Sequence, residues 1–225
     1  MIWLIGNKGM LGREVETLLK KKELAYIASD QEIDITNLGE LRIFSADKPI
    51  FWIINCAAYT AVDKAEDEPD LAFKINADGP RNIAEIAKNK GAKLIHISTD
   101  YVFDGTKAEA YVETDPPNPL GVYGQSKYQG EVNVAEVLDE YFIIRSAWLY
   151  GKQGNNFVFT MLRLFKDRDI VRVVGDQYGS PTYAPDLAVA LLAIDKNPVV
   201  LKILSDDKLL KQETFVDHQW RKVLI

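Results

Sequence analysis

The stretch Ile2-Trp3-Leu4-Ile5-Gly6-Asn7-Lys8-Gly9-Met10-Leu11-Gly12 decides the fold of this chain. Its first four residues are apolar, as in a strand that is buried on both faces. The glycines that follow allow a tight turn, and residues 14–22 carry Val15, Leu18 and Leu19 at helical spacing. The chain therefore opens with a strand, a glycine turn and a helix, an order typical of an α/β fold.

The same alternation continues along the chain. Further apolar runs predict strands at residues 25–28, 51–56 and 93–98. Amphipathic segments predict a helix that follows Asp34 with Thr36 as its N-cap, helices at 61–68 and 71–87 separated at Pro69, and a helix at 123–137. We expect a doubly wound, Rossmann-type parallel sheet with helices on both faces.

Composition limits the classes of partner. The chain has 225 residues, 47% of them hydrophobic and 27% charged, and its net charge of -6 with no basic stripe argues against a nucleic-acid partner. The single cysteine excludes an internal disulfide, and no Cys/His cluster has the spacing of a metal site. No signal peptide and no apolar run of membrane-spanning length is visible, so we expect a cytoplasmic protein without a membrane partner.

The glycine spacing indicates a dinucleotide site. Glycines let a pyrophosphate approach the backbone, and the helix N-terminus offers free N–H groups. The spacing Gly-x-x-Gly-x-x-Gly is typical of reductases and epimerases. Asp30, at the end of the second strand, favours the ribose hydroxyl of NAD, whereas Lys8 favours the 2′-phosphate of NADP. We therefore expect NADPH or NADH as the cofactor; the alternative for Asp30 is a helix or turn cap.

Tyr123 and Lys127 lie four residues apart, on one face of the predicted helix. A nearby ammonium lowers the pKa of a tyrosine, which makes Tyr123 a usable general acid. The alternative is a plain amphipathic helix face. Thr99, with Ser98 as the second choice, offers a hydroxyl at the end of a strand that can stabilise an alkoxide. We expect His96 and Cys56 to be packing residues.

Four motifs together resemble the extended short-chain dehydrogenase/reductases, and among them the dTDP-4-dehydrorhamnose reductases. These motifs are Gly6-x-x-Gly9-x-x-Gly12, the stretch from Asn55 to Glu66, the stretch from Ser98 to Gly105, and Tyr123-x-x-x-Lys127. Three later blocks of the subfamily also occur in order, namely residues 145–151, 155–157 and 175–182. The resemblance extends from Met1 to about Ile194.

The resemblance implies hydride transfer to the C4 ketone of a dTDP-linked 4-keto-6-deoxy sugar, which yields dTDP-L-rhamnose. It implies that Thr99 orients the ketone, that Tyr123 supplies a proton, and that Lys127 lowers the pKa of Tyr123 and holds the nicotinamide ribose. The implied cofactor residues are Gly6, Lys8, Gly9, Met10, Leu11, Gly12, Asp30, Asp34, Ile35, Ala57, Ala58, Tyr59, Asn76, Tyr123 and Lys127. The implied substrate residues are Thr99, Asp100, Val102, Tyr123, Trp148, Asn155, Asn156, Gln177 and Thr182, with core packing as the alternative for Trp148.

The chain departs from the resemblance in two places. Glu14 matches one glutamate of a magnesium site through which some members dimerise, but Pro185 stands where another ligand is expected, so we expect no metal and a monomer or weak homodimer. The stretch Ser205-Asp-Asp-Lys-Leu-Leu-Lys-Gln-Glu-Thr has no counterpart in the family. We expect residues 1–150 to form the NAD(P)-binding domain and 151–225 a partial substrate region, incomplete through truncation or a frame shift after about Pro198.

Two further function classes fit these residues. The shortened C-terminus favours a non-catalytic NADP-binding protein, either a regulatory subunit like the methionine adenosyltransferase partner that shares this fold or an inactive relic. An epimerase or dehydratase of the same superfamily is the third class. A dehydratase usually has acidic residues after the threonine, and here only Asp100 is present.

Overall fold

The computed structural model describes residues 1–194 and 221–224. Their main feature is a parallel sheet of six strands in the order β2-β1-β3-β4-β5-β8. The strands are β1 (Ile2–Ile5), β2 (Tyr26–Ser29), β3 (Trp52–Asn55), β4 (Lys93–Thr99), β5 (Tyr141–Ser146) and β8 (Arg221–Leu224). The predicted Rossmann-type sheet is confirmed. The expected break after Pro198 and the stretch 205–214 lie outside the described residues.

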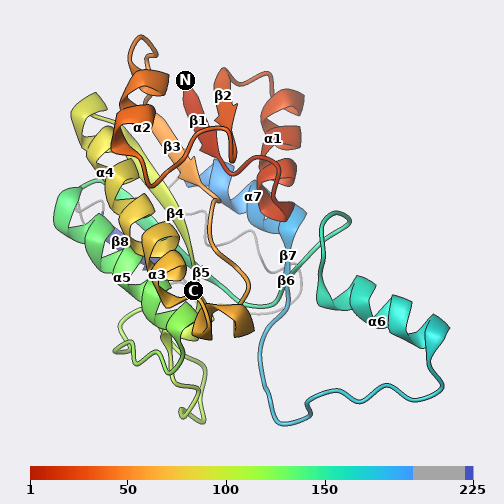
Figure 1. Cartoon of the computed structure of the whole chain (residues 1–225). Helices are drawn as coiled ribbons and strands as arrows, with labels where there is room; N and C mark the ends of the chain where they lie inside the picture. Colours follow the sequence, from red (N-terminus) through yellow and green to blue (C-terminus); the bar gives the residue numbers. More distant parts are fainter. Residues whose placement is uncertain (195–220, 225) are drawn as a thin grey trace.

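Helices cover both faces of the sheet (Figure 1). One face carries α1 (Met10–Lys21) and α7 (Ala184–Ala193), and the other carries α2 (Leu38–Ser45), α4 (Gly79–Lys90) and α5 (Val122–Val137). Successive β1 side chains point to opposite faces. Trp3 accordingly packs in the core under α4 and Leu4 in the core under α1, and neither is exposed. This arrangement explains why the first apolar run is continuous rather than alternating.

The strand order reverses at β1. The chain passes from β1 to β2 on one side and returns to β3 on the other side of β1, which is the point at the carboxyl edge where open parallel sheets bind ligands. Gly6 begins the first of these loops with φ of 80°. A Cβ atom on Gly6 would lie 2.6 Å from the backbone nitrogen of Ala57, so the two loops are in direct backbone contact.

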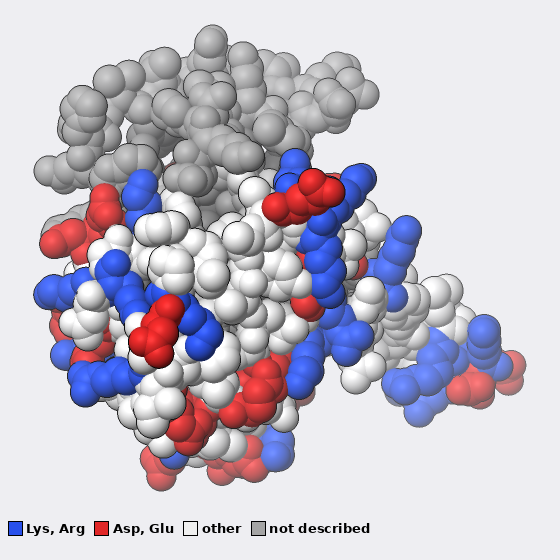
Figure 2. Space-filling view, turned by 90° about the horizontal axis from the view of Figure 1, so that it is seen from above, with Lys and Arg blue, Asp and Glu red and all other residues white. Residues whose placement is uncertain are grey.

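Shorter elements surround this edge. They are the 3₁₀ turns η1 (Asp63–Glu66) and η3 (Asp100–Val102), α3 (Pro69–Phe73), the π-helical turn η2 (Lys74–Asp78), and the two-stranded sheet of β6 (Leu149–Tyr150) and β7 (Thr182–Tyr183). Helix α6 (Phe157–Asp167) extends away from the main sheet (Figure 1) and contains no buried residue. On the face shown in Figure 2, Lys and Arg side chains are interspersed with Asp and Glu side chains.

Two local predictions were wrong. The N-cap of α2 is Asn37 and not Thr36, because the Asn37 side chain accepts hydrogen bonds from the amides of Gly39 and Glu40. The predicted helix at 61–68 is only the 3₁₀ turn η1, and the helix expected from residue 71 begins two residues earlier at Pro69, since a proline at the first helical position has no amide to leave unpaired. Within the described residues, no helix is both long and apolar enough to cross a bilayer.

Candidate active site at the carboxyl edge of the sheet

The glycine loop forms a backbone cradle between β1 and α1. A Cβ atom on Gly12 would lie 2.0 Å from the carbonyl oxygen of Gly6, so only glycine fits there. Gly9 is the N-cap of α1 and makes no side-chain cap hydrogen bond, while Met10 and Leu11 form the first turn. Uncapped amides at a helix N-terminus bind phosphate groups well. The residues present therefore fit the pyrophosphate of a dinucleotide.

Two acidic residues that follow β2, Asp30 and Glu32, both bind Lys8 of the glycine loop. A carboxylate oxygen of Asp30 accepts a hydrogen bond from the amide of Lys8 at 2.9 Å. The Lys8 ammonium forms an exposed ion pair with Glu32 at 2.9 Å. Asp34 caps a turn by accepting from the amide of Thr36 at 2.8 Å, and Ile35 is buried against Gly79. The predicted Asp30 and Lys8 thus lie together beside the glycine loop.

The loop after β3 is held in place by Asn76 of the π-helical turn. The Asn76 carboxamide accepts from the amide of Tyr59 at 2.8 Å and donates to the carbonyl oxygen of Tyr59 at 3.0 Å. It also donates to the hydroxyl of Ser126 on α5 at 3.1 Å. Asn76 is only 1% exposed. Its side chain therefore fixes the loop of Ala57, Ala58 and Tyr59 through the backbone of Tyr59.

Thr99, Tyr123 and Lys127 converge where β4 ends and α5 begins. Thr99 is the last residue of β4, Tyr123 lies in the first turn of α5 and Lys127 lies one turn later. The Thr99 hydroxyl donates to Asp100 at 3.1 Å and accepts from the amide of Tyr101 at 3.2 Å. The Tyr101 ring, which sequence reasoning missed, meets the Tyr123 ring edge to face at 5.6 Å between centroids.

The acid–base properties of the three residues depend on burial. Burial raises the pKa of Tyr123 to about 12, although its hydrogen bond with the Thr99 side chain favours the phenolate. Burial also lowers the pKa of Lys127 to about 8, while the Glu131 carboxylate acts in the opposite direction. The expected lowering of the Tyr123 pKa by Lys127 is wrong for this structure. The Lys127 ammonium donates instead to the carbonyl oxygen of Ile97 at 2.7 Å.

The residues predicted to bind substrate lie in two places, directly after β4 and around the small sheet of β6 and β7. Asp100 borders the Thr99 hydroxyl, and burial raises its pKa, whereas Val102 has no exposed surface. Trp148 is 45% exposed with φ of 45°, and a Cβ atom on Gly179 would lie 2.9 Å from its indole. Segment 177–182 therefore lies against Trp148.

The remaining predicted substrate residues lie around the small sheet. Thr182 on β7 donates its amide to the carbonyl oxygen of Trp148 at 3.3 Å. Asn156 is the N-cap of α6, and its side chain bonds the amide of Phe159 and the carbonyl oxygen of Gly151. Asn155 and Gln177 are exposed. The side chain of Asn156 is thus occupied by local structure, whereas those of Asn155 and Gln177 face solvent.

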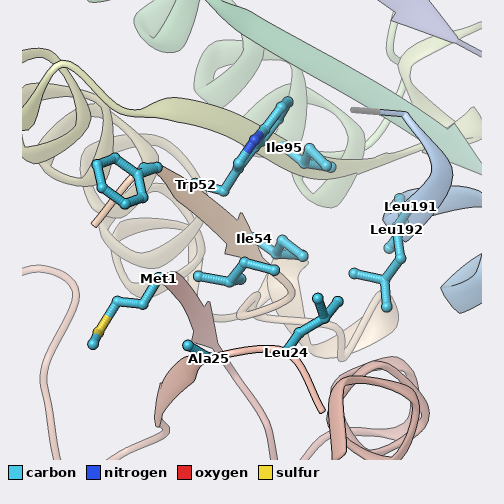
Figure 3. Close-up of a pocket in the computed structure, with 10 residues that line it drawn as sticks. Met1, Leu24, Ala25, Trp52, Ile54, Ile95, Leu191 and Leu192 are labelled. Atoms are coloured by element: carbon cyan, nitrogen blue, oxygen red, sulfur yellow. The ribbon is translucent and has the colours of Figure 1, made fainter. Parts of the chain in front are cut away.

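A separate hollow lies at the opposite, amino-terminal edge of the sheet (Figure 3). Its volume is about 270 Å³, and its lining includes Met1, Leu24, Trp52, Leu191 and Leu192. None of the side chains that line it is ionisable. The hollow therefore offers no acid–base chemistry, and the candidate active site is the carboxyl edge with Thr99, Tyr123 and Lys127.

Comparisons with known proteins show which family this chain is similar to. Residues 1–204 match the family model described as the RmlD substrate binding domain. The chain is 47% identical over 195 residues to a dTDP-4-dehydrorhamnose reductase of Streptomyces griseus, an alignment that covers 85% of this chain and 64% of that protein. The chain thus spans less than two thirds of the length of that relative.

Two solved structures are also similar. A dTDP-4-dehydrorhamnose reductase of Clostridium acetobutylicum is 49% identical with a TM-score of 0.83, covering 86% of this chain and 70% of its own. The enzyme of Bacillus anthracis, solved in complex with NADP, is 47% identical with a TM-score of 0.82, covering 86% and 69% respectively.

Proposed function

Because this chain belongs to the RmlD substrate binding domain family, we propose that it reduces the C4 ketone of dTDP-4-dehydro-6-deoxy-L-mannose with NADPH or NADH to give dTDP-L-rhamnose. The observation that carries the proposal is the convergence of Thr99, Tyr123 and Lys127 at the end of β4, at the same carboxyl edge of the sheet as the glycine loop after β1. The similar proteins named as dTDP-4-dehydrorhamnose reductases, one of them solved with NADP, support the substrate and the cofactor.

The nicotinamide cofactor, when bound, supplies the hydride. The backbone amides of Met10, Leu11 and Gly12, in the first turn of α1, hold its pyrophosphate, while Gly6 and Gly9 let it approach the loop. Asp30 and Lys8 meet its adenosine ribose. Asp34 and Ile35 border the adenine side, and the loop of Ala57, Ala58 and Tyr59, supported by Asn76, lines the cleft. The protein thus contributes binding and orientation.

On the substrate side, the Thr99 hydroxyl orients the ketone and Tyr123 protonates the alkoxide that reduction generates. A pKa of about 12 keeps Tyr123 protonated at neutral pH. Because an alkoxide is a far stronger base than a phenolate, the proton transfer is favourable even from this weak acid. Lys127 holds the nicotinamide ribose with its ammonium group.

Binding of the nucleotide part falls to the region around the small sheet. We propose Asp100, Trp148, Asn155, Asn156, Gln177 and Thr182 as the residues that meet the dTDP-sugar, whereas Val102, which has no exposed surface, packs beneath the site. In this division, residues 1–150 form the cofactor domain and 151–225 the part of the substrate region that this chain contains. The proposal includes action in the cytoplasm as a monomer or weak homodimer. Light scattering of the purified chain tests the oligomeric state.

The direct test is the loss of nicotinamide absorbance when the chain is mixed with NADPH and the dTDP-linked 4-keto-6-deoxy-L-sugar. We expect turnover by the wild type, and a loss of at least about 100-fold in kcat for Tyr123→Phe because the proton donor is removed. Tyr128→Phe, on the same helix, is the matched control and retains activity. Binding of NADPH without turnover by the wild type would refute the proposal and favour a non-catalytic cofactor-binding protein.

A further inference from the structure

The buried Glu131 carboxylate connects three elements beneath the candidate active site. Glu131 lies on α5 and is 4% exposed. Arg145 on β5, 5% exposed, binds it as a fork, with Nε 3.0 Å from Oε1 and Nη2 2.6 Å from Oε2. The Ser98 hydroxyl of β4 donates to Oε1 of the same carboxylate. A bidentate, charge-assisted pair of this kind fixes the orientation of both side chains.

Glu131 and its partner Ser98 each adjoin residues of the proposed machinery. On α5, Glu131 follows Lys127 by one helical turn and Tyr123 by two, so the three side chains share a face. On β4, Ser98 immediately precedes Thr99, and it is paired in register with Arg145 of β5. The Arg145 guanidinium also lies 5.0 Å from the centre of the Phe103 ring, just after η3. Glu131 therefore ties the helix with the proton donor to the strand with Thr99.

The carboxylate also has an electrostatic relation to Lys127. Two other titratable groups face this ammonium, the Cys56 thiol after β3 and the His96 imidazole of β4. Burial raises the pKa of Cys56 to about 12 and lowers that of His96 well below its ordinary value, so both are neutral at pH 7. Among these described neighbours, Glu131 alone supplies negative charge to a lysine that burial disfavours as a cation.

We propose that Glu131, held by Arg145, is a positioning residue that fixes α5 against the end of β4 and keeps Lys127 in the ammonium form. This inference rests on the proposed reductase function, because only that function requires the charge of Lys127. Glu131 does not face the reacting atoms. Its carboxylate is engaged by Arg145 and Ser98, so it acts through Lys127 and Tyr123.

The test compares pH profiles of kcat for the whole chain. Glu131→Gln alone leaves the Arg145 charge buried and unpaired, which can prevent folding. The main variant is therefore E131L/R145M, in which apolar side chains of similar size replace the pair. If Lys127 must be charged, activity falls above its pKa. Loss of Glu131 lowers the pKa of Lys127, and with it the pH at which kcat falls, by about one unit. At a pH above the pKa of Lys127 in both proteins, kcat of the variant should therefore be about tenfold lower than that of wild type.

Two controls separate a positioning role from a merely structural one. Glu136→Gln, which also lies on α5, removes an exposed ion pair with Arg81 of α4. It should leave the pH at which kcat falls unchanged. Glu131→Asp keeps the charge, so it restores the limit of the wild type even if kcat is lower. A uniform loss of kcat at every pH in E131L/R145M, with an unmoved limit, would overturn the proposal.

A second measurement does not need turnover. The ¹³Cε chemical shift of Lys127, assigned by comparison with Lys127→Met, reports its titration directly in wild type, E131L/R145M and E131Q. We expect the titration midpoint to fall by about one pH unit when the carboxylate is removed. An unchanged midpoint contradicts the inference about Glu131, whereas a shifted midpoint in a chain without reductase activity sustains the electrostatic relation and refutes only the proposed function.

Discussion

Lys127 donates its ammonium proton to the carbonyl oxygen of Ile97 across 2.7 Å, from the second turn of α5 to the middle strand β4. This contact holds the charged group of a residue that is 2% exposed, one helical turn after the proposed proton donor Tyr123. It also removes the ammonium from solvent, and burial lowers its pKa to about 8. The helix and the strand are thus joined by the residue whose charge the proposed chemistry uses.

The first prediction concerns the pH dependence of stability. Lys127 titrates near 8 in the folded protein and near 10.4 when unfolded, so the unfolded state binds more protons between these values and the folded state gains stability as pH rises through them. We expect the free energy of unfolding of wild type relative to Lys127→Met to increase by about 3 kcal/mol from pH 7.5 to pH 11. Urea unfolding at several pH values measures it. A difference that is independent of pH would contradict the burial of a charged Lys127.

The second prediction concerns the packing of α5. A Cβ atom on Gly130 would lie 2.1 Å from the carbonyl oxygen of Asn76, and a backbone atom cannot move aside cheaply. Gly130→Ala should therefore lower the free energy of unfolding by about 1–3 kcal/mol, as overpacked positions do. Gly175→Ala is the control, because no atom lies within 4 Å of its Cβ position. Equal stability of the two variants in urea would refute the close approach.

The third prediction concerns the support of the β3 loop. Asn76→Ala removes hydrogen bonds to both backbone groups of Tyr59 and to Ser126. Buried groups left unpaired cost about 1–3 kcal/mol, so we expect a destabilisation of that size together with weaker NADPH binding. Denaturation and NADPH fluorescence titration measure the two effects. Asn118→Ala, which loses one exposed bond to Asp104, is the control and should leave NADPH binding unchanged.

The fourth prediction concerns the choice between NADPH and NADH. The Lys8 ammonium is paired with Glu32 at 2.9 Å. Glu32→Gln frees this charge for a 2′-phosphate, so the ratio of kcat/KM for NADPH to that for NADH should rise several-fold, and less at high salt because the pair is exposed. Lys8→Met should lower the same ratio. A ratio that neither substitution changes would exclude Lys8 from cofactor selection.

Local sequence determined most of the architecture. The apolar run before Gly6 and the alternation of strands and helices are short-range patterns, and they predicted β1, α1 and the layered parallel sheet, although the helix predicted at 61–68 is only a 3₁₀ turn. Tyr123 and Lys127 share a helix face because helical periodicity alone requires it. Errors arose where two neighbouring residues compete for one local role, as Thr36 and Asn37 do for the N-cap of α2.

Tertiary structure alone decided the electrostatics of the site. The pKa of Tyr123 is raised and that of Lys127 lowered because the packing of α5 against the sheet desolvates both side chains, and desolvation depends on residues that are distant in sequence. The link from Glu131 to Arg145 and Ser98 was not predicted, because it too joins residues from different elements of the chain. The sequence shows each of these residues, but only the packing of parallel strands against α5 brings their side chains together.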